Sequence, residues 1–322
     1  MSYYVTGDCH GNIYNIIHFL NYKTTTTDDV MILLGDAGLN YYLNDRDKRN
    51  KEILSEYPVT YLCIHGNHEA RPESIASYTT KIWHGGVVFY EEEYPYILFA
   101  RDGEVYDMDG SKVIAIGGAY SIDKEFRIMA GLPWFSDEQP SDAVKTYVEQ
   151  QLENHNWCVD YVLTHTCPLK YQPTELFLSS YDQSKVDRST EEWMSDIEKK
   201  LTYKKWYFAH YHANKSYNDA EMLFEGIKEM GKEGFVQKIG SPKYRMGELV
   251  MFNIQFDDKV FQCYGKIVVI DAYGTLGQPY EVSYDIQGPD YRCDNNEINK
   301  EVLYKHITES QIESVDEIKT RA

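Results

Sequence analysis

Basic side chains are scarce in this sequence. Its 322 residues include 32 lysines and arginines against 51 aspartates and glutamates, which gives a formal net charge of −19 at pH 7. The resulting field repels a phosphate backbone, so it argues against nonspecific nucleic-acid binding, although a local basic groove could override it. The same field raises a question for any phosphorylated substrate, because something inside an acidic protein must hold the anion. Bound cations are the simplest answer.

Paired cysteines and long apolar runs are also lacking. The six cysteines lie far apart, without the spacing of a disulfide framework or a cysteine zinc site. No apolar run approaches the roughly 18–20 residues of a membrane-spanning helix, and the first residues, MSYYVTGDCHG, show no basic stretch leading into an apolar one. With 43% apolar and 26% charged residues, the composition is that of a globular protein. We therefore expect a cytoplasmic protein with no membrane partner.

Short apolar runs alternate with helical patterns up to about residue 230, which favours α/β or α+β layering. The strands that we predict just before polar segments are Tyr3–Thr6, Val30–Leu34, Val59–Ile64, Tyr161–Leu163 and Trp206–Ala209. Each of them runs within a few residues into Asp, Asn or His. A further pair, Glu104–Met108 and Lys112–Ile116, is expected to form a hairpin with its turn at Asp109-Gly110.

The composition changes after about residue 230, where glycines suggest a connector. Beyond it we predict the strands Leu249–Ile254, Phe261–Tyr264, Lys266–Ile270 and Glu281–Ile286, with turns at Asp257-Asp258, Tyr273-Gly274 and Gly288-Pro289. The sequence therefore predicts a large domain over residues 1–234 and a small all-β barrel over residues 235–322.

Metal-capable side chains follow the predicted strands of the large domain. The five segments are Asp8-Cys9-His10, Gly35-Asp36, Gly66-Asn67-His68-Glu69, His165 and His210-Tyr211-His212. Because ligands bind at the carboxyl edge of the sheet in layered α/β folds, these residues can converge there. Their oxygens and imidazoles suit divalent transition ions and are enough for two. Two ions about 3.5–4 Å apart clamp a phosphoryl oxygen and lower the pKa of a bridging water, which predicts phosphoester hydrolysis.

These segments resemble the five-motif signature of the calcineurin-like metallophosphoesterases, D-x-H, G-D, G-N-H-[DE], H and G-H-x-H, in the right order. Gly117–Pro140 is also similar to a segment of small bacterial and phage-encoded members. The resemblance implies an α+β fold, with a four-layer α-β-β-α sandwich carrying a dinuclear site at the strand ends. It also implies a metal-dependent phosphatase or phosphodiesterase whose nucleophile is a hydroxide that bridges the two ions.

The resemblance also implies a role for each residue. One ion would be held by Asp8, His10 and His212, with Asp36 bridging to a second ion held by Asn67, His165 and His210. Asp36 and His68 would be the catalytic residues. His68 would not bind metal but would stabilise the transition state or protonate the leaving oxygen. Manganese is the first expectation for the ions, while iron, zinc and nickel suit the same ligands.

Two departures from the family pattern stand out. Ala209 replaces the usual glycine of the last motif, which strains the backbone only if φ there is positive. The motif at Gly35-Asp36 lacks the Asp-Arg-Gly continuation of eukaryotic-type serine/threonine protein phosphatases, so we do not expect that activity. For substrate binding the candidates are Arg71, Arg101 and Arg127, because a guanidinium fork suits phosphate oxygens, although an ordinary surface or ion-pair role is favoured for each.

Other readings stay open. From Ser241 onward the pattern resembles an SH3-like barrel, with Tyr244–Val250 as its first strand, and it could serve as a protein-contact or dimerisation module or as a plain appendage. The whole protein could be a metal-binding scaffold without turnover. It could also be a nucleotide-specific or nucleic-acid-specific phosphodiesterase, which would need a basic or aromatic groove that the sequence does not place.

Overall fold

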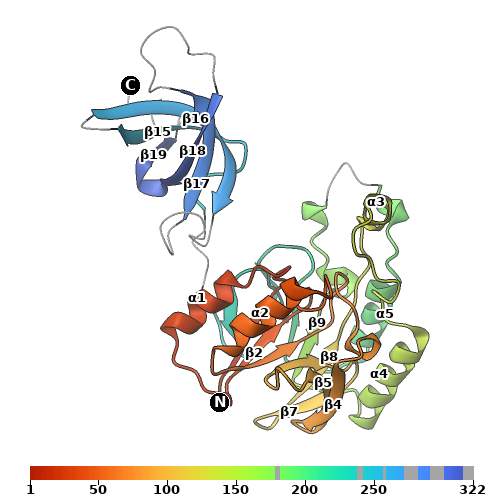
Figure 1. Cartoon of the computed structure of the whole chain (residues 1–322). Coiled ribbons are helices and arrows are strands. Elements are labelled where there is room, and N and C mark those ends of the chain that lie inside the picture. The colour runs from red at the N-terminus through yellow and green to blue at the C-terminus, as the bar shows by residue number, and fades with distance from the viewer. Residues whose placement is uncertain (178–181, 238–241, 257–258, 272–281, 291–300, 315–322) are drawn as a thin grey trace. The chain divides into compact units, whose positions relative to one another are not determined.

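The structure is a computed structural model (Figure 1) that describes all residues except 178–181, 238–241, 257–258, 272–281, 291–300 and 315–322. The chain divides into two compact units, residues 1–237 and 238–322. The boundary differs from the expected one at residue 234. Phe235–Gln237 forms strand β14, which pairs with β13 in the large unit, so these residues do not belong to the small unit.

The first sheet of the large unit has eight strands, in the order β14-β13-β1-β2-β3-β6-β5-β4. Their bounds are β1 Tyr3–Thr6, β2 Val30–Leu33, β3 Thr60–Cys63, β4 Tyr78–Trp83, β5 Gly86–Glu91, β6 Ile97–Ala100, β13 Ile227–Glu229 and β14 Phe235–Gln237. The neighbours β1, β2, β3 and β6 are parallel. The predicted strands Tyr3–Thr6, Val30–Leu34 and Val59–Ile64 are confirmed as β1, β2 and β3, to within one residue at each end.

The second sheet has six strands, in the order β11-β12-β10-β9-β8-β7. Their bounds are β7 Val105–Met108, β8 Ser111–Ile116, β9 Tyr161–Thr164, β10 Lys205–Phe208, β11 Lys215–Ser216 and β12 Ala220–Met222. Strands β8, β9, β10 and β12 are parallel neighbours. The predicted hairpin between β7 and β8 is confirmed, and both residues of its turn have positive φ, 52° at Asp109 and 84° at Gly110. Asp-Gly favours a two-residue turn of this kind.

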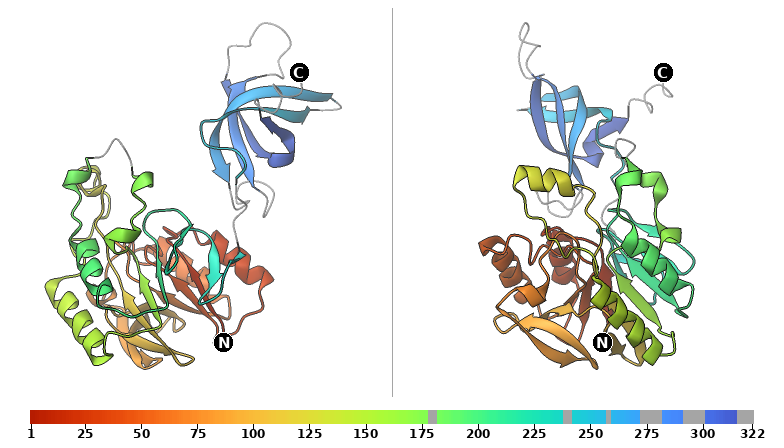
Figure 2. Two further views of the ribbon diagram at one scale, coloured as in Figure 1. Left: turned by 180° about the vertical axis from the view of Figure 1, so that it is seen from behind. Right: turned by 90° about the vertical axis from the view of Figure 1, so that its right-hand side faces the viewer.

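Five α-helices and short 3₁₀ turns complete the large unit. The helices are α1 Tyr14–Tyr22, α2 Asp45–Ser55, α3 Lys124–Ala130, α4 Asp142–Asn154 and α5 Ser189–Glu198. The 3₁₀ turns are η1 Pro72–Ser74, η2 Leu169–Tyr171, η3 Thr174–Leu176 and η4 Gln183–Lys185. Figure 2 shows α1 and α2 on one side of the paired sheets and α4 on the other.

Three apolar clusters explain these layers. One cluster holds Val5 and Leu62 of the first sheet together with Leu163 and Tyr207 of the second, so the two sheets share a core. A second cluster joins α1 and α2 to the other face of the first sheet, and a third joins α4 and α5 to the second sheet. The central strands are therefore buried on both faces, which is why they read as continuous apolar runs. The large unit is a mixed α/β fold.

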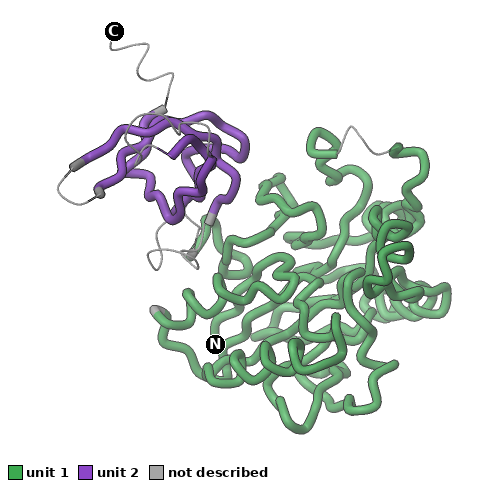
Figure 3. Tube along the Cα trace, turned by 45° about the horizontal axis from the view of Figure 1, so that its top comes forward, with its two compact units in different colours: residues 1–237 green, residues 238–322 purple. Residues whose placement is uncertain are grey.

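The small unit, purple in Figure 3, holds one antiparallel sheet in the order β18-β17-β16-β15-β19. Its bounds are β15 Leu249–Phe256, β16 Lys259–Asp271, β17 Ser283–Pro289, β18 Glu301–Thr308 and β19 Ile312–Ser314, with a 3₁₀ turn η5 at Glu309–Gln311. Side chains of four strands and of Tyr244 and Ile312 form its buried core.

Three sequence predictions for the small unit are wrong: the separation of two strands at Gly265, the turn at Gly288-Pro289 and the start of the first strand at Tyr244. Phe261–Tyr264 and Lys266–Ile270 are parts of one strand, β16. The strand continues through Gly265, which lies between them. A Cβ at Gly265 would lie 2.5 Å from Ile286 Cγ2, so glycine at this position allows close packing of the neighbouring strand. Gly288-Pro289 ends β17 instead of forming a turn after a shorter strand.

Tyr244 lies before the sheet, because the first strand begins only at Leu249. The expected turns at Asp257-Asp258 and Tyr273-Gly274 fall outside the described residues. Within the described part of the chain, no helix has both the length and the apolar character needed to cross a membrane.

Candidate metal centre

The five sequence segments meet at one edge of the large unit. Asp8 follows β1, Asp36 follows β2 and Asn67 follows β3, and these three strands are parallel neighbours. From the second sheet, His165 follows β9 and His210 follows β10, which are also parallel neighbours. The carboxyl ends of the strands in both sheets lie at this edge, which brings all five segments together.

The backbone at this edge is strained. Four of the seven proposed metal ligands have left-handed φ without being glycine: His10 (47°), Asp36 (45°), His210 (69°) and His212 (48°). Such residues are uncommon and cluster at functional sites, at a cost of about 1 kcal/mol or more each. Ala209 is not among the residues with positive φ, so replacing the family glycine by alanine adds no strain there.

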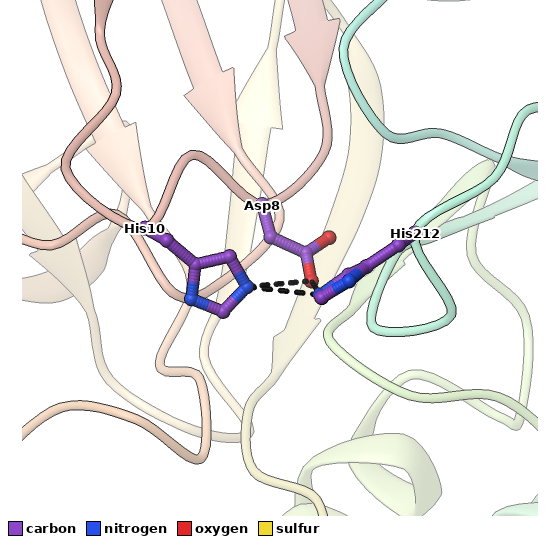
Figure 4. Close-up of side chains that lie close together, drawn as sticks. All are labelled: Asp8, His10 and His212. Carbon is purple, nitrogen blue, oxygen red and sulfur yellow. Dashed lines mark hydrogen bonds and ion pairs between the residues drawn. The ribbon is translucent and has the colours of Figure 1, made fainter. Parts of the chain in front are cut away.

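Asp8, His10 and His212 form the first group that could hold an ion (Figure 4). Nε2 of His212 lies 3.3 Å and Nε2 of His10 lies 3.8 Å from Asp8 Oδ2, and the two imidazole nitrogens are 2.9 Å apart. Asp8 Oδ1 accepts a hydrogen bond from the His210 backbone N–H at 3.0 Å. Asp8 Oδ2 is buried and has no hydrogen-bond partner. A buried carboxylate oxygen without a donor, facing two imidazole nitrogens, fits a divalent cation.

Asp8, Asp36 and His165 form the second group. His165 Nε2 lies 3.6 Å from Asp36 Oδ2 and 2.8 Å from Asn67 Oδ1. Nδ1 of His165 is 2.7 Å from the Leu34 carbonyl oxygen, which can only accept, so Nδ1 carries the hydrogen. In the neutral ring, Nε2 is then an acceptor facing the amide oxygen of Asn67. A cation shared by Nε2 and the amide oxygen would remove the repulsion between these two acceptors, and a contact between the other ring nitrogen and a carbonyl is typical of metal-binding histidines.

His210 and His68 lie beside these groups. The ring of His210 is 5.0 Å from that of His165, and burial lowers the pKa of His210 to about 3. The ring of His68 is 5.6 Å from that of His10, and its backbone N–H donates to Asp36 Oδ1 at 2.8 Å. Burial, with the nearby Arg127 adding to it, lowers the pKa of His68 to about 2. Both imidazoles are therefore neutral near pH 7.

The carboxylates show opposite shifts. Burial alone would raise the pKa of Asp8, but the close contact with His212 and the neighbouring imidazoles hold that pKa well below its usual range. Burial and the charge of Asp36 raise the pKa of Glu69 to about 8. Glu69 Oε1 accepts the Gly66 N–H at 2.8 Å, so Glu69 fixes the turn that carries Asn67. Asp8 is thus kept ionised at the site, while the buried Glu69 holds the turn before Asn67 in place.

Two glycines allow the close approach of these ligands. A Cβ on Gly35, whose φ is +95°, would lie 2.1 Å from His165 Nδ1. A Cβ on Gly66 would lie 2.0 Å from Asp36 Oδ1. No side chain fits at either position without displacing a ligand.

The three arginines of the sequence analysis all bind carboxylates. Arg71 pairs with Asp102 at 2.7 Å, and Arg101 pairs with Glu104 at 3.7 Å. None of the three arginines lines the hollow that opens at the metal ligands. Arg127 pairs with Asp123 at 2.7 Å, and its Nη2 lies 3.5 Å from His68 Nε2. Of the three, the structure brings only Arg127 to a site residue.

A hollow of about 410 Å³ opens at the ligands Asp36, Asn67, His210 and His212. The lining also includes Tyr120, Ser121 and Ile122, which lie in the glycine-rich segment after a predicted strand that the sequence indicated as pocket rim. Sequence reasoning missed other lining residues, which include Leu176, Phe177, Val186, Arg188 and Tyr211. Tyr211 was detectable, since it lies between two motif histidines. The other missed residues belong to no motif, and only long-range folding brings them to the ligands.

Comparison with known proteins gives one family. The family model described as calcineurin-like phosphoesterase matches residues 1–226. No curated protein sequence matches the chain. Among solved structures, a phosphopantetheinyl hydrolase from Mycobacterium tuberculosis is 15% identical, with a TM-score of 0.40 over 69% of this chain and 88% of that one.

Two further structures are similar at lower scores. A protein of unknown function from Aquifex aeolicus is 14% identical, with a TM-score of 0.28 over 51% of this chain and 80% of that one. A serine/threonine phosphatase from Saccharomyces cerevisiae is 12% identical, with a TM-score of 0.24 over 70% and 67%.

Proposed function

The chain belongs to the calcineurin-like phosphoesterase family and is a phosphoric ester hydrolase, and from this premise we propose that it works as a metal-dependent phosphatase or phosphodiesterase with two divalent ions. The observation that carries the proposal is that the two groups of potential ligands adjoin, with donor atoms within 4.8 Å of one another in each group. Asp36 Oδ2 lies near a histidine of each group, 3.9 Å from His10 Nδ1 and 3.6 Å from His165 Nε2. Two adjoining groups with a common carboxylate are what a pair of neighbouring ions needs.

We assign the ligands as the family motifs suggest. Asp8, His10 and His212 hold one ion, Asp36 bridges, and Asn67, His165 and His210 hold the other. When bound, two such ions polarise the phosphoryl oxygens and lower the pKa of the water that attacks phosphorus. The contacts of Asp36 with His10 and His165, at 3.9 and 3.6 Å, support its bridging place. Manganese is our first choice, with iron, zinc and nickel as alternatives.

His68 acts on the departing oxygen in this proposal. Its backbone N–H holds Asp36, and its ring lines the hollow next to the ligands. A neutral imidazole there can donate one hydrogen to the leaving oxygen and stabilise the charge that develops on it. Arg127, hydrogen-bonded to the Tyr41 hydroxyl at 2.7 Å, keeps a positive charge beside the ring.

Three finer points belong to the same proposal. The large unit is the four-layer sandwich of the family, which the three apolar clusters support. The small unit is an SH3-like barrel that contacts a protein partner or a second copy of the chain. The protein resides in the cytoplasm, which the dispersed cysteines favour.

The test is hydrolysis of p-nitrophenyl phosphate and bis-p-nitrophenyl phosphate by protein loaded with Mn²⁺. We expect Asp36→Asn and His68→Ala to remove most turnover, and Asp36→Asn also to lower the number of bound ions. The matched control is Asp160→Asn, because Asp160 pairs with Lys204 at the amino end of β9, away from the ligands. Binding of two ions without hydrolysis of either ester would contradict the proposal and favour a scaffold.

A further inference from the structure

The six arginines of the large unit fall into two sets. Arg71, Arg101 and Arg127 each pair with a carboxylate. Within the described residues, Arg46, Arg49 and Arg188 form no ion pair at 4.0 Å or less, and Arg188 interacts with the Glu191 carboxylate only at longer range. Arg46 lies over the Tyr42 ring, with 4.8 Å between its Cζ and the ring centroid, and Arg188 makes only a long hydrogen bond of 3.5 Å to Gln183. Unpaired guanidinium groups are notable in a chain of net charge −19.

All three unpaired arginines line hollows at the metal centre. Arg188 belongs to the hollow of about 410 Å³ described above. Arg46 and Arg49, on the first turns of α2, line a separate hollow of about 260 Å³. Its other lining residues are His10, Gly11, Gly38, Tyr41, Tyr42, Asp47 and Asn50.

The two hollows share no lining residue but adjoin at the ligands. His10 lines the smaller hollow and His212 lines the larger, and their Nε2 atoms are 2.9 Å apart. Arg127 lies between them, because it contacts Tyr41 of one hollow and His68 of the other. A phosphoryl group at the ligands therefore has a separate space available to each of two substituents.

The smaller hollow suits an anion. Its two arginines face one acidic side chain, Asp47. The Asp47 carboxylate is buried and its Oδ2 accepts the Leu43 backbone N–H at 2.7 Å, while burial raises its pKa. Asp47 therefore serves the local backbone and leaves both guanidinium groups available to a phosphate or carboxylate of the ligand.

The larger hollow suits a planar apolar group. Phe177 and Tyr211 stack with ring centroids 6.1 Å apart and an angle of 22°. The Tyr211 hydroxyl is 3.0 Å from Thr166 Oγ1 and accepts from Gln172 at 3.1 Å, so the ring is held in place. Apolar side chains of two distant segments complete the wall, and a flat ring can lie against it.

We propose that the substrate is a phosphodiester with two unlike arms, an anionic arm held by Arg46 and Arg49 and a planar apolar arm held by Phe177 and Tyr211. A monoester has one substituent, so it would fill one hollow and leave the other empty, whereas a diester reaches both. Water forms a new P–O bond, the P–O bond to one arm breaks, and that arm leaves as an alcohol carrying a proton from the water. The products are a phosphomonoester and an alcohol. This inference rests on the proposed function and narrows it.

The probe is a thymidine dinucleotide without a terminal phosphate or with one at its 5′ or 3′ end. The phosphorylated forms contain a monoester and a diester in one molecule, so chromatography of the products shows which bond is cut. We expect the full chain loaded with Mn²⁺ to cut the internal diester. At least one phosphorylated form should have a kcat/KM about tenfold above that of the unphosphorylated form, as charge-assisted hydrogen bonds to arginine allow.

Variants assign the effect to the two hollows. The double substitution Arg46→Gln with Arg49→Gln should reduce that ratio toward one, and both positions are exposed on α2, so folding is preserved. Phe177→Ala should lower kcat/KM for the unphosphorylated dinucleotide about tenfold through lost stacking. The control Arg245→Gln, the same change at an exposed position of the small unit, should leave both values unchanged.

Each contrary result has its own meaning. If inorganic phosphate were the only product released, this inference would be overturned and the proposed function would stand. The same would follow if the phosphorylated and unphosphorylated dinucleotides were cleaved at equal rates, both by the original protein and by the double variant. Hydrolysis of bis-p-nitrophenyl phosphate without cleavage of any dinucleotide would overturn the assignment of the two arms. Failure to hydrolyse any ester would overturn the proposed function and this inference with it.

Discussion

The proposed ligands that follow β2, β3 and β9 are buried, whereas two histidines in the loops after β1 and β10 face solvent. His165, Asn67 and Asp36 are 0%, 1% and 2% exposed. The side chains of His10 and His212 are 35% and 52% exposed. We call the first set the buried half of the centre and the second the open half.

Different contacts hold the two halves. In the buried half, His165 binds a backbone carbonyl and Asn67 donates to Ser121 Oγ at 2.8 Å, so the protein fixes these ligands whether or not an ion is bound. In the open half, His10 and His212 contact each other and the Asp8 carboxylate, and the His212 ring stacks on Phe224 with ring centroids 5.0 Å apart. We therefore expect the buried half to bind its ion more tightly, because its ligands need little rearrangement.

The largest loss of stability and activity should come from Gly35→Ala, which places a new atom against a ligand of the buried half. The new Cβ would lie 2.1 Å from His165 Nδ1, and the φ of +95° adds strain. We expect the free energy of unfolding to fall by more than about 3 kcal/mol and kcat to fall at least about 100-fold. Chemical denaturation and a turnover assay measure the two quantities.

Gly110→Ala is the matched control for that substitution. Gly110 has a similar φ of +84°, but no atom lies within 4 Å of its would-be Cβ. It should lose about 1 kcal/mol of stability and no activity. Equal losses in the two variants would show that backbone strain, and not the position of His165, governs the buried half.

The next largest effect is a difference in stability between variants of the buried half and of the open half, measured in metal-free protein. His165→Ala leaves a cavity and an unpaired Leu34 carbonyl, so we expect it to lower the free energy of unfolding by about 3 kcal/mol. His212→Ala removes a half-exposed side chain and should cost about 1 kcal/mol or less. Urea unfolding in the presence of a chelator gives both values. A larger loss for His212→Ala would reverse the comparison.

A smaller effect should follow from Ser121→Ala, which touches the buried half only through Asn67. Loss of the acceptor for the hydrogen bond that Asn67 Nδ2 donates frees the amide to rotate, so we expect metal affinity to fall about tenfold with little change in fold stability. Ser141→Ala removes the cap of α4 and should leave metal affinity unchanged. Calorimetric titration with Mn²⁺ distinguishes the two outcomes.

The sequence was enough to predict which segments meet. Parallel neighbours align their carboxyl ends, so Asp8 and Asp36 had to lie at one edge of the first sheet once their strands were identified. The meeting with His165 of the second sheet was implied by the family resemblance and is seen in the structure. Continuous apolar runs revealed those strands because both of their faces are buried. The division into a buried and an open half could not be predicted, since the burial of a side chain depends on loops from elsewhere in the chain.

Highly charged and loop segments were beyond the sequence patterns. Helix α2 reads DRDKRNKEILS, with little apolar periodicity, so no helix was predicted there and Arg46 and Arg49 went unnoticed. Arg188 and Phe177 lie outside every motif and reach the centre only through long-range folding. In the small unit, Gly265 looked like a break between two strands because a glycine used for close packing has the same letter as one used for a turn.

The smallest effect is expected from Ala209→Gly, which restores the family's residue just before the two histidines of β10's loop. If glycine were required at this position, the variant should raise turnover. Ala209 is buried and its φ is not positive, while the left-handed φ values fall on His210 and His212 themselves. We therefore expect kcat/KM to change less than about twofold and stability to fall by about 1 kcal/mol or less, as for an ordinary alanine-to-glycine change. A clear gain in turnover would show that the strained position of this loop is Ala209 and not His210. The residue that determines where the ligands of both halves lie would then be one position earlier than the structure indicates.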